Sequence, residues 1–428
     1  MTSAKFGLIF SFANEVQYPY LIKERIFDCP IYGKIKVSKT AAEIIAMPEF
    51  QRLSKIRQMG LHPAVNHSRF EHSIGTYYLT GVVLTHLITK YPDQKYSMPH
   101  LSNEPIIFTE RIIELIMIAG LCHDIGHGPY SHVFDKLVVN KSRHPNRHHV
   151  IRSCLIVKKI CRDLFTQQEI DFIINVINPV LPCSKLPLYQ IVANQVFGID
   201  IDRMDYLQRD SYYLKKPLYF NPFRIIHAMN IVDDHFAFND DCLIEIQKFF
   251  QNRFDMHRKT YNNSNELVTE RMLTDNIDKD LFEQCLSDMD LFCTLTDKDL
   301  FIKNVANSLM IHSQHQYKII ADILDLNIYY KMKNFRKYIC EKLDLPLSSL
   351  KIIQVHNTLS GIDNLPNPFS EIYFCSENMN CHTFTRSCDY NRCLENKCIL
   401  ICKDVSKFEI ILAEWQEFAM FMYNDAKF

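Results

Sequence analysis

The sequence predicts a mainly α-helical protein that carries a small α+β lobe in its C-terminal part. From Ala41 to about Leu326 the apolar residues recur mostly three and four positions apart, which is typical of helices with one buried face. Beyond about residue 348 short apolar runs alternate with turn-rich segments, as in a sheet. We therefore expect a helical domain with short N-terminal strands over residues 1–347 and an α+β lobe over residues 348–428.

The elements follow in order from these patterns. Residues 20–37 are expected to form short strands around a turn at residues 29–33. Polar or proline-bearing breaks near 91–106, 141–148 and 181–188 predict loops between helices. In the lobe, strands are predicted at 351–356, 371–375 and 398–402, and a last helix at 407–423.

Composition excludes several classes of protein. A net charge of −1 and a pI near 7.0 give no general attraction to nucleic acid or to a membrane surface, so an anionic ligand needs a local basic site. The chain has no run of 18 apolar residues, and polar residues appear too early for a signal peptide. Fifteen cysteines without a secretion signal predict free thiols in a reducing compartment, the cytoplasm or else the nucleus.

The segment 119–132 carries the clearest sign of a chemical function. His123 and Asp124 directly follow the largely apolar run 112–121, which suits a buried helix that delivers its last turn into a pocket. His127 lies four residues after His123, so on a helix both would project from one face. Nitrogen and oxygen ligands suit a divalent metal ion, and His127 could act on a substrate beside it.

Two distant segments supply partners for this pair. His72 lies in the segment 68–73 beside Arg69, whose guanidinium can bind phosphate in a bidentate manner, and Asp202 lies in the segment 198–210. Each residue alone has a structural explanation, such as a hydrogen-bonded core histidine. Together two imidazoles and two carboxylates predict one metal site. Its expected ligands are His72, His123, Asp124 and Asp202.

Two polar stripes repeat every four residues in this apolar helical region. Asp202, Tyr206 and Asp210 form one stripe, and Arg253, His257 and Tyr261 form the other. Burying such side chains unpaired would cost on the order of several kcal/mol, so we expect them to line a site, although the second stripe could also be a solvated face.

These segments resemble the HD-domain phosphohydrolase superfamily, and in particular its deoxynucleoside triphosphate triphosphohydrolase branch. The likeness runs from about Pro30 into the C-terminal lobe and is strongest at 69–75 and 119–132. The SAM domain of the mammalian member is not expected here. The Lys-, Ile- and Asn-rich, Gly-poor composition would fit a large DNA virus.

The resemblance implies that the chain hydrolyses dNTPs to deoxynucleoside and inorganic triphosphate as a homo-oligomer, a dimer or larger. It implies one divalent ion (Fe, Mn, Zn or Mg) at the metal site, with Mg²⁺ accompanying the triphosphate as a further option. Phosphate contact and proton donation would fall to His127, His132 and His149, although which one protonates the leaving oxygen stays open. The implied substrate contacts are Gln58, Met59, Arg69, Arg203, Tyr206, Asp210, Arg253, His257 and Tyr261.

The chain departs from that branch at its regulatory positions. Ala46 and Ser54 stand where the mammalian enzyme reads GTP with an Asp and an Arg, although Gln51 and Arg25 remain. Asn263 and Ser264 replace basic residues of the second nucleotide site there. We therefore expect activity that does not require GTP. A carboxylate after His149 is also missing, with Val150 in its place.

Two other functions stay open. A two-metal HD phosphodiesterase acting on cyclic nucleotides is favoured by the doublet His148-His149, which could supply a second ion. His-Asp-Ile-Gly-His in place of His-Asp-Ile-Gly-Lys, and the lack of a Gly-Tyr-Pro segment, argue against it. A non-catalytic nucleotide-binding protein is the other alternative; nucleic acid is not expected as the main ligand, because no basic, aromatic-laced stripe is present.

Overall fold

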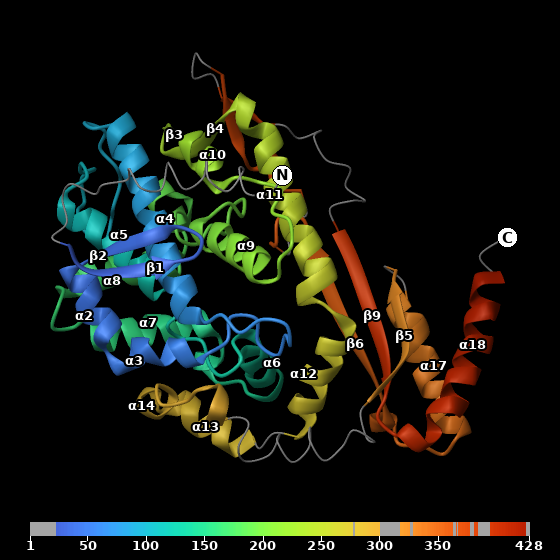
Figure 1. Cartoon of the computed structure of the whole chain (residues 1–428). Helices are drawn as coiled ribbons and strands as arrows, with labels where there is room; N and C mark the ends of the chain where they lie inside the picture. The colour runs from blue at the N-terminus through green and yellow to red at the C-terminus, as the bar shows by residue number, and fades with distance from the viewer. Residues whose placement is uncertain are drawn as a thin grey trace. The chain divides into compact units, whose positions relative to one another are not determined.

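The computed structural model describes residues 23–276, 279–299, 317–325, 328–362, 365, 367–376, 381–383 and 394–424 (Figure 1). The chain divides into two compact units. Unit 1 comprises 1–253, 278–299 and 368–387, and unit 2 comprises 254–277, 300–367 and 388–428. Helices dominate and the sheets are small, so the predicted fold class is confirmed.

Unit 1 is built mainly of helices. Its helices are α2 (Lys39–Ala46), α3 (Pro48–Gln51), α4 (Arg69–Lys90), α5 (Glu110–Cys122), α6 (His132–Lys141), α7 (His149–Ile160), α8 (Gln167–Ile177), α9 (Ile201–Tyr213), α10 (Pro222–His227), most of α11 (Leu243–Met256), α13 (Lys279–Ser287) and α14 (Met289–Phe292). Its strands are β1 (Lys23–Cys29), β2 (Gly33–Ser38), β3 (Met229–Val232), β4 (His235–Asn239), β7 (Tyr373–Cys375) and β8 (Cys381–Thr383). The predicted loops lie between α4 and α5, between α6 and α7, and between α8 and α9.

Helix α4 is the centre of unit 1 and packs against both α5 and α9 (Figure 1). It begins with a capping box, in which the Ser68 hydroxyl accepts from the Glu71 backbone N–H and the Glu71 carboxylate accepts from the Ser68 backbone N–H. It approaches α5 closely at Gly120, where an added Cβ would lie 2.4 Å from the Thr80 Oγ1 atom. The Thr76 hydroxyl donates to the Gly120 carbonyl across this contact at 2.8 Å. The close crossing holds the N-terminal turn of α4 near the end of α5.

Two small sheets belong to unit 1. Strands β1 and β2 form an antiparallel hairpin, as predicted for residues 20–37. The second sheet has the order β3-β4-β7-β8, with β4 and β7 parallel. The β3–β4 hairpin lies in the stretch where helix was expected to dominate, and it was not predicted. Its turn consists of Asp233 and Asp234, both with positive φ (48° and 58°), and lacks the glycine that usually marks such a turn.

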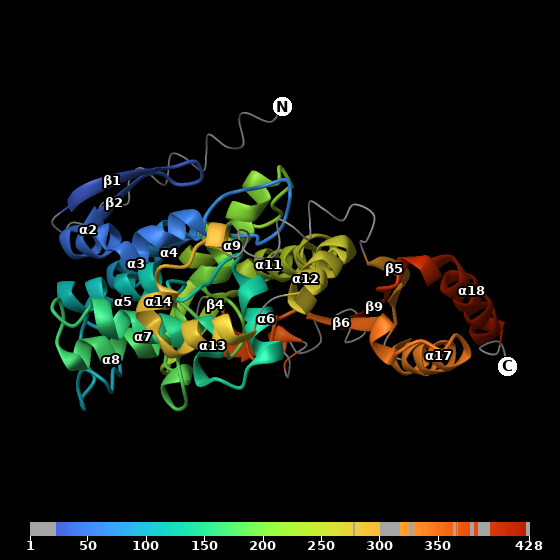
Figure 2. The ribbon, with the colours of Figure 1, turned by 90° about the horizontal axis from the view of Figure 1, so that it is seen from below.

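Unit 2 places a three-stranded antiparallel sheet between helices. Its strands, in the order β5-β9-β6, are β5 (Lys318–Leu324), β9 (Leu394–Cys402) and β6 (Leu350–Thr358). Its helices are the end of α11, a π-helical turn (His257–Tyr261), α12 (Ser264–Asn276), α17 (Ile328–Lys342) and α18 (Phe408–Asn424). Figures 1 and 2 show α12 on one face of this sheet and α17 with α18 on the other.

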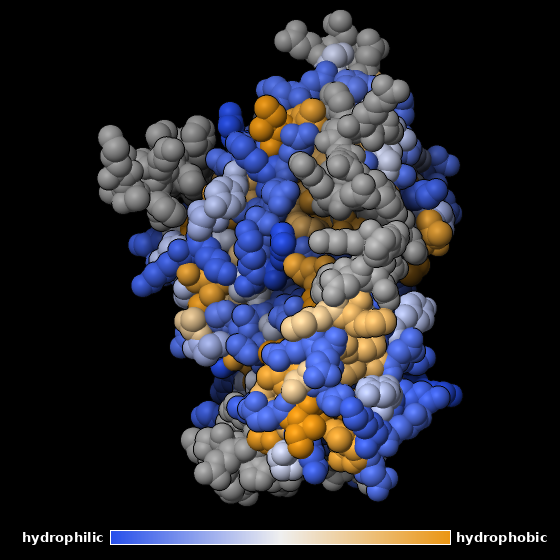
Figure 3. Space-filling model, turned by 90° about the vertical axis from the view of Figure 1, so that its right-hand side faces the viewer, coloured by the Kyte–Doolittle hydropathy of each residue, from blue (hydrophilic) through white to orange (hydrophobic). Residues whose placement is uncertain are grey.

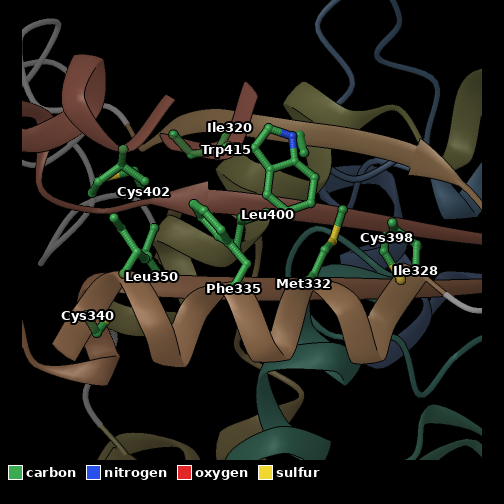
Figure 4. Packing of buried hydrophobic residues seen from close by; sticks show 13 residues of the cluster. Ile320, Ile328, Met332, Phe335, Cys340, Leu350, Cys398, Leu400, Cys402 and Trp415 are labelled. Atoms are coloured by element: carbon green, nitrogen blue, oxygen red, sulfur yellow. The ribbon is translucent and has the colours of Figure 1, made fainter. Parts of the chain in front are cut away.

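Alternate residues of β9 serve the two faces of that sheet. Cys398, Leu400 and Cys402 join the core under α17 and α18, where the rings of Phe335 and Trp415 meet edge to face at 5.0 Å (Figure 4). Ile399 and Ile401 pack instead against α12. Because successive strand residues face opposite sides of the sheet and both sides are covered here, residues 398–402 of β9 form one continuous apolar run.

The predicted boundary between residues 347 and 348 falls inside unit 2. The elements β5 and α17 precede residue 347 but pack with β6 and β9, which follow it. The helical pattern before residue 348 did not reveal β5. The predicted domain boundary itself stays a prediction.

The described cysteines are free thiols, and most of them are buried among apolar side chains. Cys388 and Cys393 of the C-terminal cysteine group lie outside the described residues. None of the described helices combines the length and the apolar character needed to cross a membrane. Figure 3 shows apolar surface interrupted by polar residues on the face that it presents.

Candidate metal centre and histidine cluster

Four predicted ligands come from three helices of unit 1. His72 lies in the first turns of α4, His123 caps the end of α5 with Asp124 directly after it, and Asp202 lies in the first turn of α9. The Nε2 atom of His72 is 3.0 Å from Asp202 Oδ1 and 3.4 Å from Asp124 Oδ2. The Nε2 atom of His123 is 3.5 Å from each of the same two oxygens. The structure therefore brings the four side chains together.

This spacing fits a divalent cation. Two ligand atoms that are each about 2.1 Å from one ion, at an angle of about 90–110°, lie about 3.0–3.4 Å apart. His72, His123 and Asp202 form the group whose ligand atoms all converge, and Asp124 adds its carboxylate beside them. A bound ion would polarise a phosphoryl oxygen or lower the pKa of a water.

The two imidazoles are oriented to present Nε2. The Nδ1 atom of His123 lies 2.9 Å from the Gly120 carbonyl, so Nδ1 is the donor, and in the neutral imidazole Nε2 then carries the lone pair. That Nε2 atom is buried and has no hydrogen-bond partner. His72 uses Nδ1 at 2.7 Å from Asp205 Oδ2. An unpartnered buried nitrogen beside two carboxylates is what a metal ligand requires.

Local charges keep the site carboxylates ionised. Burial alone raises the pKa of Asp124, but His123 and the Arg69 guanidinium bring it well below the usual value. Burial likewise opposes ionisation of Asp202, but the neighbouring imidazoles of His123 and His72 lower its pKa. Burial and the nearby Arg69 lower the pKa of His127 well below its usual value, so this imidazole is neutral at pH 7.

The three predicted catalytic histidines form a second group next to the metal centre. The rings of His127 and His149 stack at 4.0 Å, and His132 meets them edge-on at 4.9 and 5.5 Å. His127 Nε2 lies 3.3 Å from Asp124 Oδ1, which links this group to the metal ligands. His132 is exposed, whereas His127 is fully buried. Their catalytic roles stay predictions.

Asp135 was missed by sequence reasoning. It lies on α6, pairs with His149 Nδ1 and with Arg152, and thereby leaves His149 Nε2 available. Burial opposes ionisation of this carboxyl, but His149 and Arg152 hold its pKa well below the usual value. The carboxylate missing at Val150 is thus supplied by a different helix, which adjacency in sequence could not reveal.

Two buried arginines hold the loop between Asp124 and Gly128. Arg52 donates to the carbonyls of Ile125 (2.7 Å) and His127 (2.8 Å), and Arg152 donates to the carbonyl of Gly126 (2.9 Å). Both guanidiniums also lie over the ring of Phe292, at 4.9 and 5.0 Å. The backbone carbonyls of residues 125–127 are therefore fixed by hydrogen bonds, and these bonds also fix the position of His127.

The backbone just beyond that loop is strained and held in place. Tyr130 and Ser131 have φ values of 56° and 57°, which cost on the order of 1–3 kcal/mol each for residues other than glycine. The Tyr130 N–H donates to Asp297, and the Ser131 hydroxyl accepts from Arg69 Nε at 2.8 Å and donates to the Arg57 carbonyl. Strain maintained by such bonds is typical of pre-organised sites.

The predicted phosphate contacts lie around the metal centre or are held by acids. Arg69 is buried and contacts Asp124. Arg203 pairs with Asp200, the N-cap of α9. Arg253 is buried in unit 1, and its charge acts on Tyr206, whose pKa is raised mainly by burial.

The predicted sugar contacts are connected through His67, which the sequence did not single out. His67 Nε2 lies 2.7 Å from Asp210 Oδ1, and its ring stacks on Tyr213 at 4.4 Å. The Gln58 N–H donates to the His67 carbonyl, and the Gln58 carbonyl accepts from Arg69. The side-chain oxygen of Gln58 is buried without a hydrogen-bond partner, and Met59 beside it is partly buried. The structure therefore groups Gln58, Arg69 and Asp210.

His257 and Tyr261 belong to unit 2. They open and close the π-helical turn that follows α11, and their rings meet at 4.8 Å. Their assignment to the substrate stays a prediction.

The changed regulatory positions are surface residues. Ala46 and Ser54 are exposed, and the Ser54 hydroxyl donates to the Gln51 carbonyl at 2.7 Å. The Gln51 amide donates to the Ile45 carbonyl at 2.6 Å, and the Arg25 guanidinium lies over the Phe27 ring.

Comparison with known proteins places these observations in a family. The HD-domain family model matches residues 69–210, which include all four predicted metal ligands. A putative HD domain-containing protein of Acanthamoeba polyphaga mimivirus is 37% identical over 414 residues, covering 87% of this chain and 90% of that protein. The deoxynucleoside triphosphate triphosphohydrolase SAMHD1 homolog of Dictyostelium discoideum is 30% identical over 330 residues, covering 74% of this chain and 61% of that protein. Human SAMHD1 is 29% identical over 377 residues, covering 77% of this chain and 56% of that protein.

The chain thus spans nearly the whole mimivirus protein and less than two thirds of these two SAMHD1 relatives. The matched segment contains the residues that meet at the metal centre. The chain therefore belongs to the HD-domain superfamily of hydrolases, in the group that resembles SAMHD1.

Proposed function

We propose that this chain is a metal-dependent triphosphohydrolase that cleaves dNTPs to deoxynucleoside and inorganic triphosphate. The observation that carries the proposal is the convergence of His72, His123 and Asp202 beside the histidine cluster. Several relatives are named deoxynucleoside triphosphate triphosphohydrolases, which supports the choice of substrate.

The reaction needs a water to attack the α-phosphorus while the bond to the 5′ oxygen breaks. A divalent ion held by the four ligands would supply electrostatic stabilisation to the phosphoryl group. Arg69, Arg203 and Arg253 bind the phosphate oxygens in this proposal. The departing 5′ oxygen takes a proton from one member of the histidine cluster, in which Asp135 orients His149.

In this proposal the sugar contacts are Gln58, Met59, Tyr206, Asp210, His257 and Tyr261. The unpaired side-chain oxygen of Gln58 offers an acceptor to a sugar hydroxyl. Tyr261 would exclude a ribose 2′-hydroxyl by its bulk, since rejection of an added group needs steric conflict or unpaired polar atoms.

The test is product identification. Purified protein is incubated with one dNTP and Mn²⁺, and triphosphate is separated from pyrophosphate and orthophosphate. We expect triphosphate from the wild type and a loss of at least about 100-fold for Asp202→Asn, which removes one ligand charge. The control Asp240→Asn alters a half-buried carboxylate that pairs with His382 away from the proposed ligands, and it should retain the wild-type rate. Absence of triphosphate from the wild type would contradict the proposal.

Independence from GTP is a separate part of the proposal. Ala46 and Ser54 supply neither a carboxylate nor a guanidinium to a guanine base. The rate with a single pure dNTP should therefore be the same with and without added GTP. An absolute requirement for GTP would contradict this part while leaving the triphosphohydrolase activity standing.

A two-metal phosphodiesterase is the second candidate function. It is favoured by the group His127, His132, Asp135 and His149, whose candidate ligand atoms lie within 4.8 Å of one another. Against it, Asp135 already pairs with His149 and Arg152. Elemental analysis decides between one ion and two ions per chain, and a non-catalytic binder would show no turnover of either substrate.

Homo-oligomer formation and a cytoplasmic location also remain proposals. Sedimentation of the purified protein with and without dNTP would test whether it forms a dimer or a larger assembly.

A further inference from the structure

We propose that Asp205 is a positioning residue for the metal centre. In this proposal Asp205 holds His72 in its metal-binding orientation, Arg209 fixes the Asp205 carboxylate, and Gly75 leaves space for both side chains. The proposal rests on the metal centre of the proposed function but not on the identity of the substrate. Asp205 lies three residues after Asp202 on α9, so the same helix supplies a ligand and the support of another ligand.

The contact between Asp205 and His72 selects one form of the imidazole. Asp205 Oδ2 lies 2.7 Å from His72 Nδ1, and both side chains are fully buried. A carboxylate can only accept, so Nδ1 must carry a proton, and in the neutral imidazole that binds a metal ion the lone pair is then on Nε2. That Nε2 atom is the one that lies 3.0 Å from Asp202 Oδ1. Asp205 therefore aims the ligating nitrogen at the site.

Arg209 fixes the carboxylate from the other side. Its Nε donates to Asp205 Oδ2 at 2.8 Å and its Nη2 donates to Asp205 Oδ1 at 2.9 Å, a two-pronged pair one helical turn apart. The guanidinium is fully buried, approaches Cys29 Sγ at 3.8 Å and lies 5.9 Å from the centre of the Tyr32 ring. A charge pair that is buried and doubly hydrogen-bonded keeps its geometry better than an exposed one.

Gly75 leaves room for this pair against α4. An added Cβ at Gly75 would lie 2.0 Å from Asp205 Oδ1 and 2.2 Å from Arg209 Nη2. Gly75 lies three residues after His72 on the same helix, so a side chain there would push the carboxylate away from the imidazole it supports. Gly75, Asp205 and Arg209 thus act together to keep one proposed ligand, His72, in position.

The test measures metal affinity rather than turnover. Protein stripped with a chelator is titrated with Co²⁺ alone, and the dissociation constant and the visible absorption of the bound ion are recorded. We expect Asp205→Asn and Gly75→Ala to weaken binding about 10–100-fold and to alter the absorption band, the range known for partners of ligating histidines. The control Glu245→Gln changes another buried carboxylate of unit 1, which accepts from the Asn221 N–H, and should leave both readouts unchanged.

A purely structural role for Asp205 predicts a different result. In that case the variants lose stability in the metal-free state, but the folded fraction binds Co²⁺ as tightly as the wild type, and this result overturns the proposal. If Asp205→Asn does not fold, Arg209→Lys decides, because it retains the carboxylate but holds only one of its oxygens. Weakened binding in that variant supports the proposal, and wild-type affinity overturns it. Failure of the triphosphohydrolase assay would leave these readouts intact.

Discussion

Gly126 is the position where one methyl group tests the geometry of the histidine cluster most directly. Gly126 lies in the loop between His123 and Gly128 and packs on the first turn of α7. The substitution Gly126→Ala would place a Cβ atom 2.2 Å from the His149 carbonyl oxygen, 2.3 Å from the Ser153 nitrogen and 2.8 Å from the Arg152 carbonyl carbon. All three atoms are backbone, so no side-chain rotation relieves the conflict.

The size of the effect follows from these distances. An ordinary carbon contact is about 3.5 Å, so the loop and α7 must separate by about 1 Å. The loop carries His127 and α7 begins at His149, whose rings stack at 4.0 Å. Overpacking of this kind costs about 1–3 kcal/mol of unfolding free energy, and a misplacement of about 1 Å at a reacting group can lower turnover about 100-fold.

Triphosphate release and urea unfolding measure the two effects. Ser153→Ala is the matched control, because it removes only the hydrogen bond that the Gly126 N–H donates to the Ser153 hydroxyl at 2.9 Å, a loss of about 1 kcal/mol without any steric conflict. A Gly126→Ala protein with wild-type turnover and wild-type unfolding free energy would refute the reasoning, since it would mean that α7 does not constrain the loop.

Three further predictions concern charge and metal. Arg152→Gln should lower the free energy of unfolding by about 3–5 kcal/mol in a urea titration, because Asp135 loses a buried charge partner and the Gly126 carbonyl loses its donor. An unchanged urea midpoint would contradict a stabilising role for these two Arg152 contacts. In unit 2, burial raises the pKa of Asp275, but Lys403 and Lys351 bring it to about 2, below the unfolded value of about 4. The ionised carboxylate therefore stabilises the folded state above about pH 4, and this contribution is lost as the pH falls through 2. Asp275→Asn should therefore be less stable than the wild type by about 2–3 kcal/mol at pH 7 and equal to it below pH 2, and a constant difference across that range would contradict the assignment. Removing the ion with a chelator should lower the thermal unfolding temperature of the wild type, because an ion at 100 times its dissociation constant adds about 2.7 kcal/mol, whereas a His123→Ala protein should not respond.

Sequence spacing was sufficient to name the residues that we propose as metal ligands. His72, His123, Asp124 and Asp202 could be named because two imidazoles and two carboxylates in such segments can surround one ion. The structure places the Nε2 atom of each imidazole 3.0–3.5 Å from an oxygen of each carboxylate. The amphipathic pattern was likewise enough for the helical fold class and for the N-terminal hairpin. Hydrophobic periodicity is a local property, and local properties can be read from the order of residues.

Partners across helices could be found only in the tertiary structure. Asp135, Asp205 and Asp297 are three aspartates with no local mark, yet they accept hydrogen bonds from His149, His72 and Tyr130 respectively. Which side chain meets which depends on how the helices and loops of unit 1 pack, because these partners are 14, 133 and 167 positions apart in the sequence.

The same limit applies to the sheets of both units. The β3–β4 turn has no glycine, and β5 is a short apolar run that periodicity alone does not separate from a helix. The order of residues therefore indicated the proposed metal ligands and the helical class of this protein. The tertiary structure decided which acids and arginines hold those side chains in place. The free energy of a buried charge depends on the groups that pack around it, and these groups come from distant parts of the sequence.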